Sequence, residues 1–241
     1  MKSDTNSTIR ENLAAAYRLF AHYGMDDLTY AHLSARSCER ESYYIYPLGL
    51  IFEEVTASNL IKVNLEGEII EGQEQSYNKT GYEIHGAIYR ERPDIQAVFH
   101  LHSLASTAVS ALKNGLRPLS QFSLHFYDNI GYHNYDSLVL ARQQGGDLVK
   151  DLGKNSALLL RNHGMLTVGP TIPEAFFYAY FLEKACKVQC LIGNHNDVIT
   201  PSHETALKAK ADMRAFEKDL GQRDWEAQLR MLDRLGSSYK E

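Results

Sequence analysis

Apolar residues recur every three or four positions near the start of the chain, which is the period of a helix that buries one face. They are Ile9, Leu13, Ala16, Tyr17 and Phe20. Thr8 and Glu11 have the spacing of a capping box, and Gly24 is of the residue type that most often ends a helix. The sequence therefore predicts a helix that begins at Thr8 and stops at Gly24.

Short runs of aromatic and β-branched residues follow this helix and are typical of strands. Residues 43–46 are Tyr-Tyr-Ile-Tyr and end at Pro47. Residues 61–65 and 69–70 are rich in β-branched residues, and Glu66-Gly67-Glu68 separates them. The pattern predicts one strand and then a hairpin.

The middle of the chain changes between helical and strand patterns. Residues 80–90 have the period of a helix, and Arg92-Pro93-Asp94 breaks it. Residues 95–102 alternate, so that Val98, His100 and His102 share one face of the predicted strand. The apolar run at residues 157–160 predicts a central, fully buried strand.

The last third of the chain is helical in pattern. Thr171 and Glu174 form a capping box that opens a helix reaching about residue 192. Residues 201–241 are charged, with a helical period. We expect one mixed α/β domain over residues 1–195, with helices on the faces of a single sheet, and a charged helical extension over residues 196–241.

Composition and charge exclude several classes of protein. The chain has 241 residues, of which 44% are hydrophobic and 23% are charged, and its net charge is −5 with histidine neutral. A mildly acidic chain lacks the basic surface that nucleic acid requires. The N-terminal residues are polar, and no apolar run approaches the ~20 residues of a membrane span. We therefore expect a soluble, cytoplasmic protein with neither a nucleic-acid nor a membrane partner.

The ten histidines suggest where the chemistry lies. His100 and His102 are two apart on a strand and therefore project from the same face. His163 follows the buried strand at residues 157–160, at a strand end where α/β proteins often place a site. Three neutral imidazoles with an open position suit a catalytic divalent ion, although paired histidines also occur as hydrogen-bonded core residues.

Several longer motifs resemble the class II aldolase/adducin superfamily over roughly residues 8–192. They are Tyr30-Ala-His-Leu-Ser-Ala-Arg36, Pro47-Leu-Gly-Leu50, Ile84-His-Gly-Ala-Ile-Tyr-Arg-Glu-Arg-Pro-Asp94, Val98-Phe-His-Leu-His-Ser103 and Leu160-Arg-Asn-His-Gly164. The resemblance implies a three-layer α/β/α fold around a mostly antiparallel sheet. It also implies a cyclic homotetramer with active sites at subunit boundaries.

The resemblance further implies a metal site. In the enzymes of the family, the histidines matching His100, His102 and His163 hold Zn²⁺ or a similar divalent ion. We expect Zn²⁺ here, with Mn²⁺, Fe²⁺ or Co²⁺ as alternatives. The ion polarises a ketone or enediolate oxygen while an acidic residue moves a proton.

One departure from the family pattern concerns that acidic residue. The sugar-phosphate aldolases and epimerases have a Ser-Ser-Glu run before the helix, with serines that help to hold phosphate and a glutamate that acts as acid and base. Here the run reads Lys79-Thr80-Gly81, so Gly81 stands where the glutamate would be. Other motifs, such as Gly131-Tyr-His-Asn-Tyr135, resemble the adducin-head side of the superfamily. The chain is thus expected to be a bacterial, adducin-head-like member.

Other residues are candidates for the roles left open. Glu83 and Tyr132 are candidate catalytic residues, with a solvated helix turn and interface packing as their respective alternatives. The substrate-binding candidates are His32, Lys79, Thr80 and Gly49. Arg36 and Lys79 are the cations nearest the expected anion site, with ordinary surface charge as the alternative for each.

We therefore expect a metal-dependent lyase of the aldolase or decarboxylase type. It would cleave a carbon–carbon bond of a small hydroxy or keto acid, or of a sugar-derived substrate, through a metal-stabilised enolate. Loss of the glutamate penalises aldol chemistry more than decarboxylation, which needs only a late protonation. The alternatives are a non-catalytic, adducin-like module for oligomerisation and protein interaction, and an Fe(II)-dependent oxygenase on the same scaffold.

Overall fold

A single sheet of eight strands forms the centre of the computed structural model, which describes residues 5–137, 142–193, 195 and 197–241. The strand order is β4-β3-β2-β1-β5-β8-β7-β6. Every neighbouring pair is antiparallel except β6 and β7, which run parallel. The strands are β1 (His32–Arg36), β2 (Ser42–Ile45), β3 (Ile61–Asn64), β4 (Ile69–Glu71), β5 (Ala97–Leu101), β6 (Ile130–His133), β7 (Ala157–Leu160) and β8 (Gly164–Gly169). The expected mostly antiparallel sheet is confirmed.

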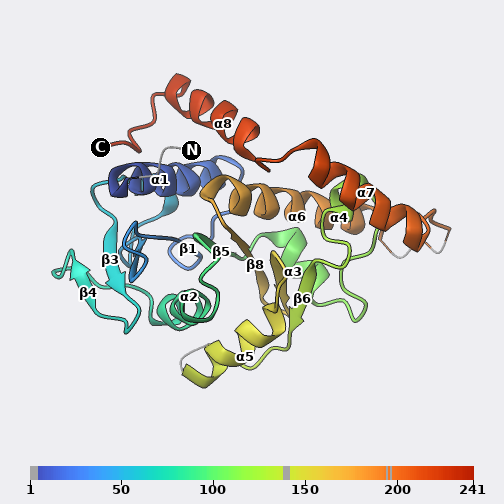
Figure 1. Cartoon of the computed structure of the whole chain (residues 1–241), viewed down its shortest axis with the longest axis horizontal. Helices are drawn as coiled ribbons and strands as arrows, with labels where there is room; N and C mark the ends of the chain where they lie inside the picture. The colour runs from blue at the N-terminus through green and yellow to red at the C-terminus, as the bar shows by residue number, and fades with distance from the viewer. Residues whose placement is uncertain (1–4, 138–141, 194, 196) are drawn as a thin grey trace.

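Helices cover both faces of this sheet and complete three layers (Figure 1). The helices α1 and α6 lie over one face, with α8 above them, and α2 and α5 lie below the other. The helical elements are α1 (Asn6–His22), the short 3₁₀ turn η1 (Phe52–Glu54), α2 (Lys79–Glu91), α3 (Leu104–Ser110), α4 (Gln121–Leu124), α5 (Arg142–Leu152), α6 (Ile172–Ile192), α7 (His203–Phe216) and α8 (Gln222–Arg234). Within the described ranges, none of them has the length and apolar character needed to cross a bilayer.

Alternate side chains of the strand β5 face opposite layers of the molecule. The ring of Phe99 packs against Phe20 of α1, with ring centroids 5.7 Å apart. His100, the next residue, faces the opposite layer, where its ring contacts His32 of β1. The apolar face therefore anchors the sheet to α1, and the polar face is left for chemistry.

Local capping differs from the sequence prediction at α1. The N-cap is Thr5, whose hydroxyl accepts a hydrogen bond from the Thr8 amide at 3.2 Å. The expected start at Thr8 is therefore wrong, because an earlier threonine already satisfies that amide. The prediction at Thr171 is confirmed, since this residue caps α6 through the Glu174 amide.

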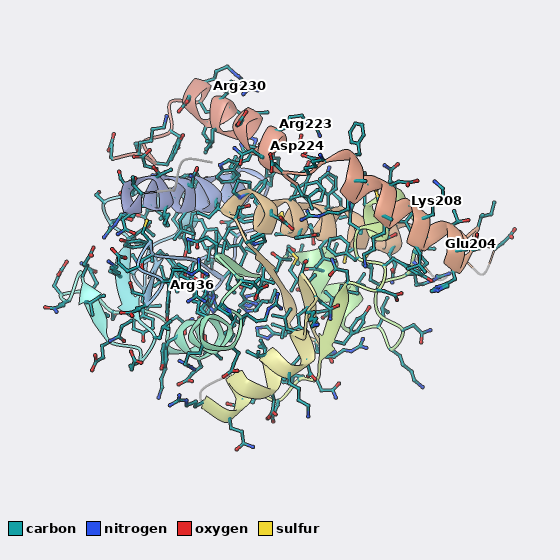
Figure 2. The ribbon with its side chains drawn as sticks, in the orientation of Figure 1. Arg36, Glu204, Lys208, Arg223, Asp224 and Arg230 are labelled. Carbon is teal, nitrogen blue, oxygen red and sulfur yellow. The ribbon has the colours of Figure 1, made fainter. Side chains whose placement is uncertain are left out.

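The C-terminal residues pack back onto the domain. Trp225 of α8 is buried, lies 5.3 Å from Phe176 between ring centroids, and donates to the Asn12 side chain at 3.0 Å. By contrast, Glu204 and Lys208 project outward from α7 in Figure 2. The helical character of residues 201–241 is confirmed, whereas the domain boundary at residue 195 stays a prediction.

Candidate metal centre

Three histidines from two segments of the chain converge at one end of the sheet. His100 lies on β5, His102 directly follows that strand, and His163 lies in the turn between β7 and β8. The Nε2 atom of His102 is 2.9 Å from that of His100 and 3.0 Å from that of His163. One ring nitrogen from each lies within 4.8 Å of the others. The structure thus brings together the three residues that the sequence singled out.

The outward nitrogens of two of these rings are already bonded. The Nδ1 atom of His100 lies 3.0 Å from the carbonyl oxygen of Met165, and that of His102 lies 2.9 Å from the Asp27 carboxylate. Both acceptors require the ring proton to be on Nδ1. When both rings are neutral, the Nε2 atoms of His100 and His102 therefore face each other as lone pairs at 2.9 Å, an arrangement that a shared cation stabilises.

The turn that carries His163 is shaped by its neighbours. Asn162 has a positive φ of 58°, in the left-handed region that asparagine tolerates better than most residues. A Cβ atom on Gly164 would lie 2.5 Å from the carbonyl oxygen of Leu101 and 3.2 Å from the His102 ring. Only glycine lets β8 approach the end of β5 this closely, and the approach brings His163 to His102.

A buried carboxylate holds the residues after His102. Glu183 of α6 accepts hydrogen bonds from the Ser103 hydroxyl at 2.7 Å and from the Ser106 amide at 3.0 Å. Its second oxygen accepts from the Ala105 amide at 3.3 Å. A negative charge is favourable at the N-terminus of α3, so Glu183 fixes the turn by which the chain leaves His102.

Burial keeps the imidazoles of the site neutral. Desolvation, followed by the neighbouring His102, lowers the pKa of His163 to about 4 and that of His100 well below its ordinary value. Desolvation likewise lowers the pKa of His32 to about 3. Metal ions bind the neutral form of histidine, so His100 and His163 fit a divalent ion in their protonation state, and the three-histidine cluster fits it in its donor set.

His32 lies beside the cluster rather than in a loop. It is the first residue of β1, it pairs with His100 across the sheet, and the two ring centroids are 4.9 Å apart. Its Nδ1 atom is 2.7 Å from Nε2 of His85 on α2. His32 is thus a strand residue that is 1% exposed, and its expected role in substrate binding stays a prediction.

The other substrate-binding candidates lie at the surface. Lys79 and Thr80 form the first turn of α2, where the Asn78 side chain accepts a hydrogen bond from the Thr80 amide. Gly49 is exposed in a turn with a positive φ of 103°. Arg36 is buried within the body of the molecule (Figure 2) and donates to the carbonyl oxygens of Tyr89 and Ile95, so it is occupied structurally.

Neither catalytic candidate reaches the three histidines through a contact between described residues. Glu83 is buried on α2, and its Oε2 atom has no hydrogen-bond partner within the described parts of the chain. The Tyr132 hydroxyl accepts from the Leu116 amide at 3.0 Å, and the Arg161 guanidinium lies 4.4 Å above its ring. Their catalytic roles stay predictions.

Sequence reasoning missed two residues that support the site. Asp27 is 75 residues from His102, and Glu183 is 80 residues from Ser103. No spacing in the sequence signals either pair, because only the tertiary fold brings each of them together. The one available signal was the pair of adjacent aspartates, Asp26 and Asp27, for which the predicted local structure gives no role.

The chain is similar in sequence to both bacterial and animal proteins. A protein of Pseudomonas aeruginosa that carries the provisional name of aldolase class 2 protein is 38% identical over 237 residues, which cover 96% of this chain and 92% of the relative. Mouse alpha-adducin is 36% identical over 245 residues, which cover 95% of this chain but 33% of alpha-adducin. The similarity to adducin is therefore confined to about a third of that protein.

Solved structures and a family model agree with the relationship that the similar sequences indicate. The aldolase II superfamily protein from Pseudomonas syringae matches with a TM-score of 0.91 and 38% identity, over 99% of this chain and 97% of that one. The L-fuculose 1-phosphate aldolase from Glaciozyma antarctica matches with a TM-score of 0.86 and 31% identity, over 98% and 93%. Residues 11–190 match the model of the class II aldolase and adducin N-terminal domain. The chain therefore belongs to the class II aldolase and adducin family.

Proposed function

We propose that this protein is a divalent-metal-dependent lyase that cleaves a carbon–carbon bond in a small hydroxy or keto acid, or in a sugar-derived substrate. The observation that carries the proposal is the pair of Nε2 lone pairs on His100 and His102, which the Met165 carbonyl and Asp27 force to face each other. Such a pair is arranged for a cation rather than for a hydrogen bond.

Three histidines would hold the ion and leave coordination positions open for a substrate. When bound, the ion would supply Lewis-acid stabilisation of negative charge on a substrate oxygen. Zn²⁺ suits three imidazole ligands well, and Mn²⁺, Fe²⁺ and Co²⁺ are the alternatives to test. The protein's part is to orient the imidazoles, which the Met165 carbonyl does at His100 and the Asp27 carboxylate does at His102.

Gly81 limits the types of reaction that the site can catalyse. A glycine has no side chain to move a proton, so a reaction that requires a strong acid or base from this position is disfavoured. Decarboxylation of a β-keto acid breaks its bond without prior proton removal from carbon, and protonation follows. We therefore expect decarboxylation to be faster than retro-aldol cleavage.

We also propose that the protein works as a homo-oligomer, most simply a tetramer. Leu104 directly follows Ser103 at the site and is 87% exposed, and Leu28, next to Asp27, is 69% exposed. Large apolar side chains this exposed beside a buried polar site suggest a surface that a neighbouring subunit covers. Light scattering of the purified protein measures the number of subunits directly.

The test begins with metal content. Protein purified without added metal should carry about one divalent ion per chain, and His102→Ala and His163→Ala should lose it, whereas His125→Ala, in the aromatic cluster with Phe177 and Phe181, should keep it. The reloaded protein is then assayed with oxaloacetate and with L-fuculose 1-phosphate. Retention of the metal by both variants, or absence of any cleavage with each of the four ions, would contradict the proposal.

A second candidate is the non-catalytic, adducin-like module. The 36% identity to mouse alpha-adducin and the glycine at position 81 favour it. In that case the three histidines would serve stability alone. The cleavage assay separates the two candidates, because a non-catalytic module cleaves neither substrate whether or not an ion is bound.

A further inference from the structure

The space beside Gly81 is filled by an imidazole from a different element. A Cβ atom built on Gly81 would lie 3.5 Å from the ring of His32 and 3.4 Å from a methyl group of Ile45. These are ordinary contact distances, so an alanine would just fit. A longer side chain pointing along the same direction would have to displace the His32 ring. Gly81 on α2 and His32 on β1 are therefore packed as a complementary pair.

His32 is placed to contact a bound molecule but not the ion itself. Its ring lies 4.9 Å from that of His100 between centroids. The cluster whose ligand atoms lie within 4.8 Å of one another contains His100, His102 and His163, and His32 is outside it in the described part of the chain. A nitrogen at such a position is too far away for a fourth ligand. It is close enough to hydrogen-bond an atom of a substrate held at the cluster.

A buried chain of hydrogen bonds fixes the other side of the His32 ring. Nδ1 of His32 is 2.7 Å from Nε2 of His85, and Nδ1 of His85 is bonded to the Ser34 hydroxyl. The Ser34 hydroxyl is 2.8 Å from that of Tyr89. All four side chains are buried, and the chain ends where Tyr89 donates to the carbonyl oxygen of Gln96 at 3.4 Å.

That last bond sets the direction of the whole chain. Tyr89 has one hydroxyl proton, and when it gives that proton to the Gln96 carbonyl, Ser34 donates to Tyr89. Ser34 must then accept from His85 Nδ1–H, which leaves Nε2 of His85 to accept from His32 Nδ1–H. The remaining nitrogen of His32, Nε2, is consequently an acceptor.

We propose that His32 is the residue that recognises a hydroxyl group of the substrate at the three-histidine site, with His85, Ser34 and Tyr89 as positioning residues that hold its Nε2 atom as an acceptor. This inference rests on the proposed function, because it assumes a small acid bound at that site. It adds that the site prefers a hydroxy acid to the matching keto acid, since a keto oxygen offers no proton to Nε2.

The experiment uses the Co²⁺-loaded protein, with lactate and pyruvate as probes of equal charge and nearly equal size. Binding is followed by the change in the visible absorption of Co²⁺, so catalysis is not needed. We expect at least one lactate enantiomer to bind about tenfold more tightly than pyruvate, which is the value of one good neutral hydrogen bond. His32→Ala should abolish this preference by weakening lactate binding while leaving the affinities for Co²⁺ and pyruvate within about twofold.

Two tyrosines provide a matched pair in case the His32 variant folds poorly. Tyr89→Phe removes the hydroxyl that orients the chain and should reduce the preference for lactate several-fold. Tyr43→Phe is the control, because the Tyr43 ring lies 5.1 Å from that of Tyr89 and is equally buried, but its hydroxyl has no hydrogen-bond partner among the described residues. It should leave the preference unchanged.

The possible failures are distinguishable. An unchanged lactate-to-pyruvate ratio in both His32→Ala and Tyr89→Phe overturns this inference and leaves the proposed function standing. Equal binding of lactate and pyruvate by the unaltered protein does the same. If the Co²⁺-loaded protein binds neither acid, this inference fails, whereas the proposed function is decided separately by the metal content and the cleavage assay.

Discussion

Asp27 controls the orientation of one candidate metal ligand from outside the cluster. Its carboxylate accepts from Nδ1–H of His102 at 2.9 Å and is 45% exposed, so its loss should affect the site more than the fold. Removing such a partner typically weakens metal binding 10- to 100-fold. We expect Asp27→Asn to show a loss of that size in a competitive titration with a chromophoric chelator.

The chain offers a matched control for this substitution. Asp151 is paired with Nδ1 of His133 at 2.7 Å and has a similar exposure of 40%, but His133 is outside the three-histidine cluster. Asp151→Asn should leave the metal affinity unchanged. Equal effects of the two variants would mean that general surface charge, and not the bond to His102, supports the ion.

Histidine burial also predicts how the metal-free protein responds to acid. The pKa of His32 is about 3 in the folded state, where desolvation is the main cause, and an unfolded chain has a value near 6.5. Between these two values the unfolded state binds a proton that the folded state does not. The contribution of His32 to the free energy of unfolding is therefore complete above about pH 6.5 and decreases as the pH falls below it. His85, whose pKa is also lowered by burial, acts in the same direction.

This pH dependence is measured by urea unfolding at pH 7 and pH 5. Each such histidine contributes a slope of up to about 1.4 kcal/mol per pH unit in that range. His32→Gln should flatten the dependence, and the exposed His22→Gln should not. A midpoint that stays the same at both pH values would show that these rings are not neutral and desolvated as described.

At the scale of elements, two adjacent glycines of α5 should respond in opposite ways to alanine. A Cβ atom on Gly145 would lie 2.7 Å from the backbone oxygen of Glu83 on α2, whereas one on Gly146 would meet nothing within 4 Å. Gly146→Ala should raise the free energy of unfolding by up to about 1 kcal/mol, because alanine favours helix. Gly145→Ala should lower it by about 1–3 kcal/mol, because α5 must move away from α2.

Chemical denaturation of the two variants under one set of conditions tests this contrast. If Gly145→Ala were also stabilising, the close approach of α5 to α2 would not exist in solution. The comparison needs no assay of function, so it checks the layer beneath the sheet independently of the proposed reaction.

The elements that periodicity predicts well are those with a regular apolar face. The face containing Ile9 and Phe20 predicts α1, and the alternation around Phe99 predicts both β5 and the shared side of His100 and His102. The strand β1 escaped prediction because it contains none of the β-branched or aromatic residues that favour strands, although polar His32, Ser34 and Arg36 alternate with apolar residues and all five residues are buried. Its polar residues can be buried because they form hydrogen bonds with α2 and with nearby carbonyl oxygens. No pattern along the sequence reveals these tertiary partners.

At the scale of the whole molecule, α8 should contribute strongly to stability although it lies far along the chain. Trp225 is 2% exposed, whereas Phe216, in the same C-terminal region, is 83% exposed. We expect Trp225→Ala to lower the free energy of unfolding by about 3–5 kcal/mol, as the loss of a large buried ring does. Phe216→Ala should change it by less than about 0.5 kcal/mol.

Calorimetry of both variants measures this difference. Similar melting temperatures for Trp225→Ala and the unaltered protein would mean that residues 201–241 are an independent appendage. The expected outcome is that they form part of one cooperative unit with α1 and α6, because Trp225 contacts both Asn12 and Phe176.

The three-histidine cluster joins segments that are far apart in sequence, and this has a kinetic consequence. His102 and His163 are 61 residues apart, and Asp27 lies 75 residues before His102. The cluster exists only after β5 has paired with β8 and the Asp27 loop has docked, and we expect contacts of such range to form late in folding. A cation captured there would slow global unfolding far more than it would speed refolding, and would therefore prolong the lifetime of the native state without changing how that state is reached.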